Sequence, residues 1–220
     1  MHLLVIVLCF VATACGSSDD DSGNERAAGA GTGARTQELA TNDKQWPEPP
    51  SMLIDPAKKY TATLDTPKGQ VVVELQPKVA PIATNNFVFL AREGFYENVP
   101  IHRIIDGFMI QSGDPTGTGT GGPGYTIEDE KVTGTYTRGT LAMARTAAPN
   151  SQGSQFFIVL TDEGGAGLQS NPTYVIFGKV VRGMEVVDAI GKVPVQAGPS
   201  DEESTPASPI AIEKVTITEA

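Results

Sequence analysis

Cysteine and histidine are scarce in this sequence of 220 residues, which contains two of each. Cys9 and Cys15 both stand near the N-terminus, and His2 and His102 lie far apart along the chain. A disulfide scaffold needs several cysteine pairs, and a zinc site of the Cys/His type needs clustered ligands. The sequence therefore excludes both kinds of protein, and it offers no candidate metal ligand set.

Positive charge is also limited. The chain has 16 Lys and Arg residues against 26 Asp and Glu residues, for a formal net charge of -10, and the basic residues form no cluster. A nucleic-acid-binding protein is expected to show a basic patch. The composition thus excludes nucleic acid as a partner and disfavours binding to acidic lipid head groups.

The N-terminus has the pattern of a targeting segment. "LLVIVLCFVATA", residues 3–14, is apolar, ends in small residues and is too short to span a bilayer. Cys15 and a polar, acidic stretch follow directly, so that the segment resembles a bacterial lipoprotein signal. We expect a signal peptide over residues 1–14, lipid attachment at Cys15 and an extracytoplasmic location, anchored to the cell membrane. The alternative is a secreted protein cleaved near Ala14 without lipid.

Residues 15–58 are expected to form a disordered linker. "GSSDDDSGNERAAGAGTGARTQ" is small, polar and acidic, with too little apolar area to offset the cost of ordering it. "WPEPPSMLIDP" is rich in proline and is expected to be extended. A flexible coil of this length spans roughly 35 Å. Trp46 has two open interpretations, as an anchor on the domain edge or as a solvated linker residue.

From residue 59 onward the pattern changes to strands. "YTATLDT" alternates, "GQVVVELQ" is β-branched, and residues 80–94 have helical spacing that places Ala83, Phe87 and Leu90 on one face. Further strands are expected at residues 99–105, 108–112, 140–144, 155–160, 174–181 and 210–218, and a second helix over residues 183–193. The sequence thus predicts a mainly β domain over residues 59–220: a closed antiparallel eight-stranded β-barrel capped by two α-helices.

Two motifs invite enzymatic interpretations that their contexts do not support. "GTGTGGPG" lacks the Lys-Ser/Thr and the helix start of a phosphate loop, and fits a flexible loop lining a groove better. His102 lies in an apolar stretch, and no G-x-S-x-G nucleophile motif marks a serine partner. We expect His102 to have a structural role.

Three separate stretches carry a family resemblance. "HRIIDGFMIQSGDPTGTGTGG", "GSQFFI" and "VIFGKVVRGMEVVD" resemble the cyclophilin family of peptidyl-prolyl cis-trans isomerases, and the likeness runs from about residue 60 to residue 220. It implies an isomerase that works without a cofactor, binds proline-containing polypeptide segments and acts as a monomer.

The resemblance also implies the site. It assigns catalysis to Arg103, Phe108 and Gln111. It places substrate binding at Met109, Gly119, Ala144, Arg145, Gln155, Phe157, Leu168 and Tyr174. Arg145 departs from the commoner asparagine, and Gly167 stands where cyclosporin-sensitive members have tryptophan, which puts tight cyclosporin binding in doubt.

Together these features predict an isomerase that assists the folding of exported proteins. The rival hypothesis is a non-catalytic chaperone or scaffold that holds proline peptides at the membrane surface, and Arg103 argues against it because a mere binder would not need it. The site imposes one geometric condition. A two-residue hairpin at Asp106-Gly107 would pair Arg103 with Ile110 and leave Gln111 on the opposite face, so we predict a bulge or a longer bend here.

Overall fold

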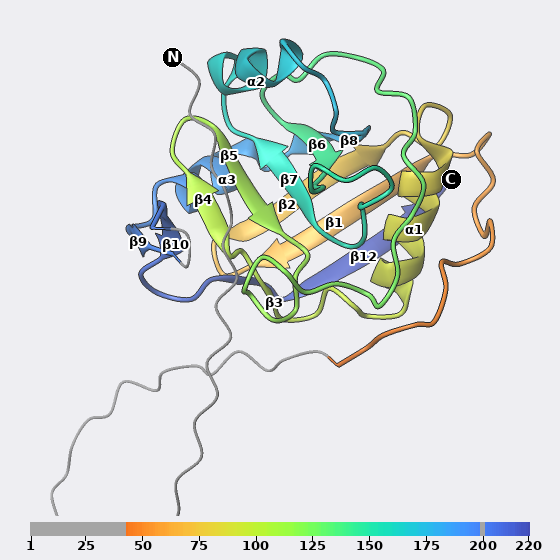
Figure 1. Cartoon of the computed structure of the whole chain (residues 1–220), viewed down its shortest axis with the longest axis horizontal. Coiled ribbons are helices and arrows are strands. Elements are labelled where there is room, and N and C mark those ends of the chain that lie inside the picture. The colour runs from red at the N-terminus through yellow and green to blue at the C-terminus, as the bar shows by residue number, and fades with distance from the viewer. Residues whose placement is uncertain (1–42, 199–200) are drawn as a thin grey trace, which may run out of the picture. The chain divides into compact units, whose positions relative to one another are not determined.

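The computed structural model describes residues 43–198 and 201–220. The expected signal segment, Cys15 and most of the expected linker lie outside the described residues. The strands, shown in Figure 1, are β1 (Tyr60–Thr66), β2 (Gly69–Leu75), β3 (Val99–Pro100), β4 (Arg103–Ile105), β5 (Met109–Ser112), β6 (Thr140–Met143), β7 (Phe156–Val159), β8 (Ile176–Arg182), β9 (Val195–Ala197), β10 (Glu203–Pro206), β11 (Ala211–Ile212) and β12 (Lys214–Glu219). The helices are α1 (Pro81–Arg92), α2 (Asp162–Gln169) and α3 (Met184–Gly191).

Eight strands form one antiparallel sheet in the order β12-β1-β2-β8-β6-β7-β5-β4. The expected eight-stranded antiparallel sheet is confirmed, but the closed barrel is wrong. The sheet is a half-barrel, because its two edge strands in the described chain, β12 and β4, do not pair with each other. The outer edge of β4 lies beside β10 instead (Figure 1). The short segments before the two edge strands pair separately, as β3 with β11, so the ladder does not continue from β4 to β12.

The two faces of this sheet carry different apolar clusters, because successive side chains of a strand point to opposite faces. Ile110, Phe156 and Ile158 face the main core. Met109 and Phe157, from the same two strands, belong to a second cluster on the other face. The second cluster supplies the apolar part of the candidate site.

Helix α1 covers the main core. Ala83, Phe87 and Leu90 are fully buried, as the sequence spacing predicts. The Phe87 ring lies 5.4 Å from that of Phe177 and 5.5 Å from that of Phe156. Figure 1 shows α1 and α3 at opposite ends of the sheet, and Val187 and Ile190 of α3 enter the same core. The two expected helices are therefore present.

Helix α2 is a third helix, at a place where the sequence analysis expects none. Its sequence, DEGGAGLQ, contains three glycines, which are poor helix formers. Thr161 caps it by accepting a hydrogen bond from the Gly164 N–H at 3.0 Å. A Cβ atom on Gly165 would meet the Tyr136 carbonyl oxygen, and one on Gly164 would lie 2.7 Å from the Gly107 oxygen. Close packing against the rest of the domain, rather than helix propensity, explains α2.

Part of the expected linker lies on the domain. The Trp46 ring is 5.2 Å from the Phe89 ring and 6.0 Å from the Phe95 ring. Its backbone N–H donates to the Pro123 carbonyl at 2.9 Å. Of the two interpretations left open for Trp46, the anchor on the domain is the one observed. In the described part of the chain no helix is long and apolar enough to cross a membrane.

Candidate active site

The bend between β4 and β5 decides whether the site can form. Ile105 pairs with Met109, so three residues form the bend, and the Phe108 N–H donates to the Ile105 carbonyl at 3.0 Å. Gly107 takes a positive φ of 73° in this bend, a conformation that glycine adopts at low cost. The longer bend that the sequence analysis requires is thereby confirmed. Arg103 and Gln111 become cross-strand partners and share one face of the sheet.

The Arg103 guanidinium lies between an amide and a carboxylate. Its Nη1 is 3.5 Å from Oε1 of Gln111, a long hydrogen bond. On its other edge, Nε donates to Glu202 Oε2 at 2.6 Å and Nη2 donates to Glu202 Oε1 at 2.9 Å. The Arg103 side chain remains about one third exposed, at 34%. The guanidinium is thus oriented on two sides and still reachable from solvent.

Gln111 links Arg103, through Gln155, to the glycine-rich loop. Its Nε2 donates to Gln155 Oε1 at 2.9 Å. Gln155 Nε2 in turn donates to the carbonyl oxygens of Gly119 and Gly121, each at 3.0 Å. Four of the sequence-predicted site residues, Arg103, Gln111, Gln155 and Gly119, therefore form one chain of hydrogen bonds.

Asp114 holds the glycine-rich loop in place by hydrogen bonds. Its fully buried carboxylate accepts hydrogen bonds from the backbone N–H groups of Thr116, Gly119 and Gly121. Burial alone would raise the pKa of Asp114, but these bonds and the Thr116 hydroxyl together lower it. The sequence analysis missed this residue. An aspartate opening the turn-forming "DPTG" segment is the signal that could have found it.

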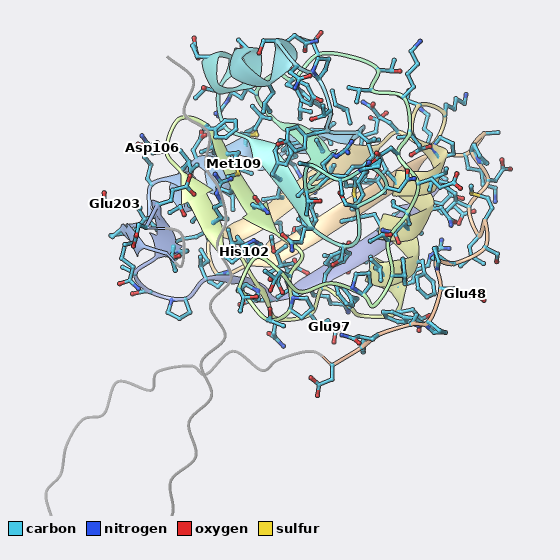
Figure 2. The ribbon with its side chains drawn as sticks, viewed as in Figure 1. Glu48, Glu97, His102, Asp106, Met109 and Glu203 are labelled. Atoms are coloured by element: carbon cyan, nitrogen blue, oxygen red, sulfur yellow. The ribbon has the colours of Figure 1, made fainter. Side chains whose placement is uncertain are left out.

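An apolar slot lies on the same face as Arg103. Met109 and Phe157 are buried in it, and the rings of Phe157 and Tyr174 meet edge to face at 5.3 Å. Phe108, Ala144, Leu168 and Tyr174 are only partly buried against this cluster. In Figure 2, Met109 is labelled near the bend between β4 and β5, and His102 lies towards the other end of this hairpin. The slot is therefore partly exposed on the side formed by these four partly buried residues.

A cavity of about 780 Å³ adjoins the slot. Gln111, Gly119, Ala144, Arg145 and Gln155 all line it, so Ala144 borders both the slot and the cavity. The remaining lining comes mainly from residues 120–126 and 151–154, with Gln45. The predicted substrate-binding residues therefore lie around an apolar slot and an adjoining cavity that meet at Ala144, together called the groove.

The Arg145 side chain is held by neighbouring residues and by Asp129. Its guanidinium forms an ion pair with Asp129 at 3.0 Å and donates to the Ala148 carbonyl at 2.8 Å. Its side chain is only 15% exposed. The charge of Arg145 is thus committed to holding the cavity wall.

Acid–base and metal chemistry find no support in this groove. Burial lowers the pKa of His102, which keeps this residue neutral near pH 7 and fits a structural role. Among the described residues, no group of three His, Cys, Asp or Glu side chains could hold a metal ion. What the groove offers is an apolar slot beside a fixed cationic donor.

The sequence model of cyclophilin type peptidyl-prolyl cis-trans isomerases matches residues 61–217. This chain belongs to the cyclophilin family. The cyclophilin is 40% identical over 162 residues to peptidyl-prolyl cis-trans isomerase-like 3 of Dictyostelium discoideum, covering 71% of this chain and 94% of that protein. It is 38% identical over 189 residues to peptidyl-prolyl cis-trans isomerase A of Mycobacterium tuberculosis, covering 76% and 97%.

Solved structures agree with this assignment. A cyclophilin from Cryptosporidium parvum matches with a TM-score of 0.64 and 35% identity, covering 73% of this chain and 98% of that one. A second structure of that protein, determined in the presence of the dipeptide Ala-Pro, matches with the same TM-score and 36% identity. The cyclophilin described here is therefore a peptidyl-prolyl cis-trans isomerase.

Proposed function

We propose that this cyclophilin isomerises Xaa-Pro bonds in exported polypeptides while it is held outside the cytoplasm by lipid on Cys15. The observation that carries the catalytic part is the position of Arg103, whose guanidinium lies on the same face as the Met109 and Phe157 slot and is paired across the strands with Gln111. The observation that supports the location is the apolar segment ending at Cys15.

Prolyl isomerisation requires only that the substrate is bound and that a charged donor lies beside the prolyl nitrogen. Rotation about an Xaa-Pro bond must overcome amide resonance, a barrier of about 18–20 kcal/mol. As the bond twists, the prolyl nitrogen loses conjugation and gains a lone pair. The slot would hold the prolyl ring, and Arg103 would donate to that lone pair. Because the lone pair exists only in the twisted state, this bond lowers the barrier rather than merely tightening binding.

The groove also accommodates the chain around the proline. Gln111 and Gln155 carry amide groups at the junction of the slot and the cavity, where they can bond to substrate carbonyl and N–H groups. Residues 119–122 of the glycine-rich loop also line the cavity. Extended polypeptide segments are therefore the class of substrate that this groove fits.

The proposed clients are proline-containing segments of exported proteins still folding near the membrane. Uncatalysed prolyl isomerisation takes about 10–100 s and limits the folding of many chains. A linker of the composition found before residue 43 would let the domain reach such clients at a distance from the membrane surface. Loss of the gene should then alter the abundance of exported proteins, and an unchanged envelope proteome would contradict the client proposal.

One experiment tests the catalytic proposal directly. The cis-to-trans exchange rate of an Ala-Pro-Phe peptide is measured with the wild-type protein and with Arg103→Ala. Acceleration by the wild type alone is the expected result. Binding of the peptide without acceleration by either protein would instead favour the non-catalytic scaffold.

A second experiment tests the location. Mass spectrometry of the mature N-terminus from the native host, together with membrane fractionation of the wild type and Cys15→Ala, is expected to show a lipidated Cys15 and its loss in the variant. A mature protein that starts near residue 15 without lipid would make it a secreted isomerase.

A further inference from the structure

The Glu202 carboxylate, from a distant part of the chain, binds the Arg103 guanidinium. Glu202 and Arg103 are 99 residues apart in sequence, yet they form a two-pronged ion pair at 2.6 and 2.9 Å. Such fork-to-fork pairs are among the strongest and most directional hydrogen bonds between side chains. Both side chains are partly exposed, Arg103 at 34% and Glu202 at 39%, so a ligand in the groove can still reach the arginine.

The pair leaves the groove side of the guanidinium available. Glu202 occupies the edge formed by Nε and Nη2. Nη1, on the other edge, faces Gln111, which lines the groove. A guanidinium has five N–H donors, and the pair with Glu202 uses two of them. Glu202 and Gln111 therefore bind different nitrogens of the guanidinium, and Glu202 leaves Nη1 to the side of Gln111.

The fold holds Glu202 in place. It immediately precedes β10, which pairs with β9 and lies beside β4. The Gly198 N–H donates to the Glu202 carbonyl at 2.9 Å, and Asp201 turns the chain with a positive φ of 58°. The sequence analysis expects no strand in this stretch. In the structure it is a hairpin placed against the strand that carries Arg103.

We propose that Glu202 is a positioning residue that acts through Arg103, fixing the guanidinium so that its Nη1 edge points into the groove. The proposal rests on the role of Arg103 in isomerisation. An arginine side chain has many rotamers, and a donor that is already oriented needs no reorganisation when the prolyl lone pair develops. The contribution of Glu202 is therefore realised in the transition state and not in binding of the ground state.

The test uses an isosteric change and a matched control. Glu202→Gln removes the charge and one of the two acceptors. Glu203→Gln makes the same change one residue further along β10, at an exposed position (Figure 2). The rate and KM are measured by NMR exchange on an Ala-Pro peptide. For Glu202→Gln we expect kcat to fall roughly three- to tenfold with KM nearly unchanged, while Glu203→Gln matches the wild type.

Two further readouts separate positioning from a structural effect. In an Arg103→Ala background, Glu202→Gln should have no additional effect on kcat, because a residue that acts through another is silent in its absence. In the free protein, the Arg103 Nε–H signal in ¹⁵N NMR should be protected from exchange and should lose that protection only in Glu202→Gln. Both glutamine variants should unfold at the same temperature.

Three results for Glu202→Gln would contradict the proposal. A kcat that rises in Glu202→Gln would show that the carboxylate restrains the arginine, and an unchanged kcat would show that the pair is irrelevant to catalysis. A raised KM with unchanged kcat would place Glu202 in substrate contact. Each of these results overturns the proposal. A wild-type protein without isomerase activity would instead overturn the proposed function, while the NMR signal would still report on the ion pair.

Discussion

Arg103 and Gln111 face each other across β4 and β5, with the guanidinium Nη1 3.5 Å from the amide oxygen. From this pair, hydrogen bonds run through Gln155 to the carbonyl groups of Gly119 and Gly121. The catalytic donor and the flexible-looking glycine loop are therefore parts of one connected array. Changes at either end of that array should alter the rate of isomerisation.

Replacing the arginine is expected to remove most of the activity. We expect Arg103→Ala to lower kcat/KM about 10²-fold, the typical cost of removing a transition-state donor. Arg103→Lys keeps the charge but loses the planar fork, and we expect it to recover only a small part of the rate. Peptide exchange measured by NMR checks both values. Circular dichroism identifies any variant that fails to fold, and a folded Arg103→Ala at wild-type rate would contradict the assigned role.

Asp114 should make stability depend on pH in the acidic range. Its folded pKa is lowered by the loop N–H groups against the opposing effect of burial. A carboxylate of this kind stabilises the fold above its unfolded pKa of about 3.9 and loses that contribution as pH falls through the folded pKa. We expect Asp114→Asn to reduce the free energy of unfolding by about 1–3 kcal/mol at pH 7.

The pH dependence of urea unfolding tests whether the charge of Asp114 is responsible, and Asp106→Asn is the control. The difference between wild type and Asp114→Asn in urea unfolding should shrink as pH falls below about 4. Asp106→Asn changes a carboxylate that is 61% exposed and pairs with Lys192, and it should have little effect at any pH. A gap between wild type and Asp114→Asn that stays constant down to pH 2 would rule out the charge as its cause.

Gly113 is expected to tolerate no side chain. It has a φ of 93°, and a Cβ atom there would lie 2.3 Å from the Ser154 carbonyl oxygen. We expect Gly113→Ala to cost about 3 kcal/mol or more, from backbone strain and from the clash. Gly107→Ala is the matched control: its φ is 73°, with open space around it, so only about 1–2 kcal/mol of strain applies. Equal losses in urea unfolding would show that the clash is relieved.

Trp46 should tie the N-terminal segment to the domain. We expect Trp46→Ala to lower the free energy of unfolding by about 2–3 kcal/mol, because it removes a partly buried ring from contact with Phe89 and Phe95. Trp46→Phe should retain part of this. Glu48→Ala, at an exposed position two residues away (Figure 2), is the control. Thermal unfolding that is identical for all three variants would show that the packing of Trp46 contributes no stability.

The local features of the fold follow from short patterns in the sequence. Alternation in residues 60–66 and β-branched residues in 69–75 produced β1 and β2, and the apolar spacing of Ala83, Phe87 and Leu90 produced the buried face of α1. These patterns reflect the periods of strand and helix, which are set within a few residues. The motifs around Arg103, Gln111 and Phe157 also identified the family before any contact was known.

Other features depend on contacts between segments that are distant in the sequence. Helix α2 forms although its sequence is rich in glycine, because Gly164 and Gly165 lie against other backbone. The half-barrel stays open because β4 lies beside β10 and not β12. Glu202 reaches Arg103 across 99 residues. No local periodicity encodes such meetings, since they result from the packing of the whole chain.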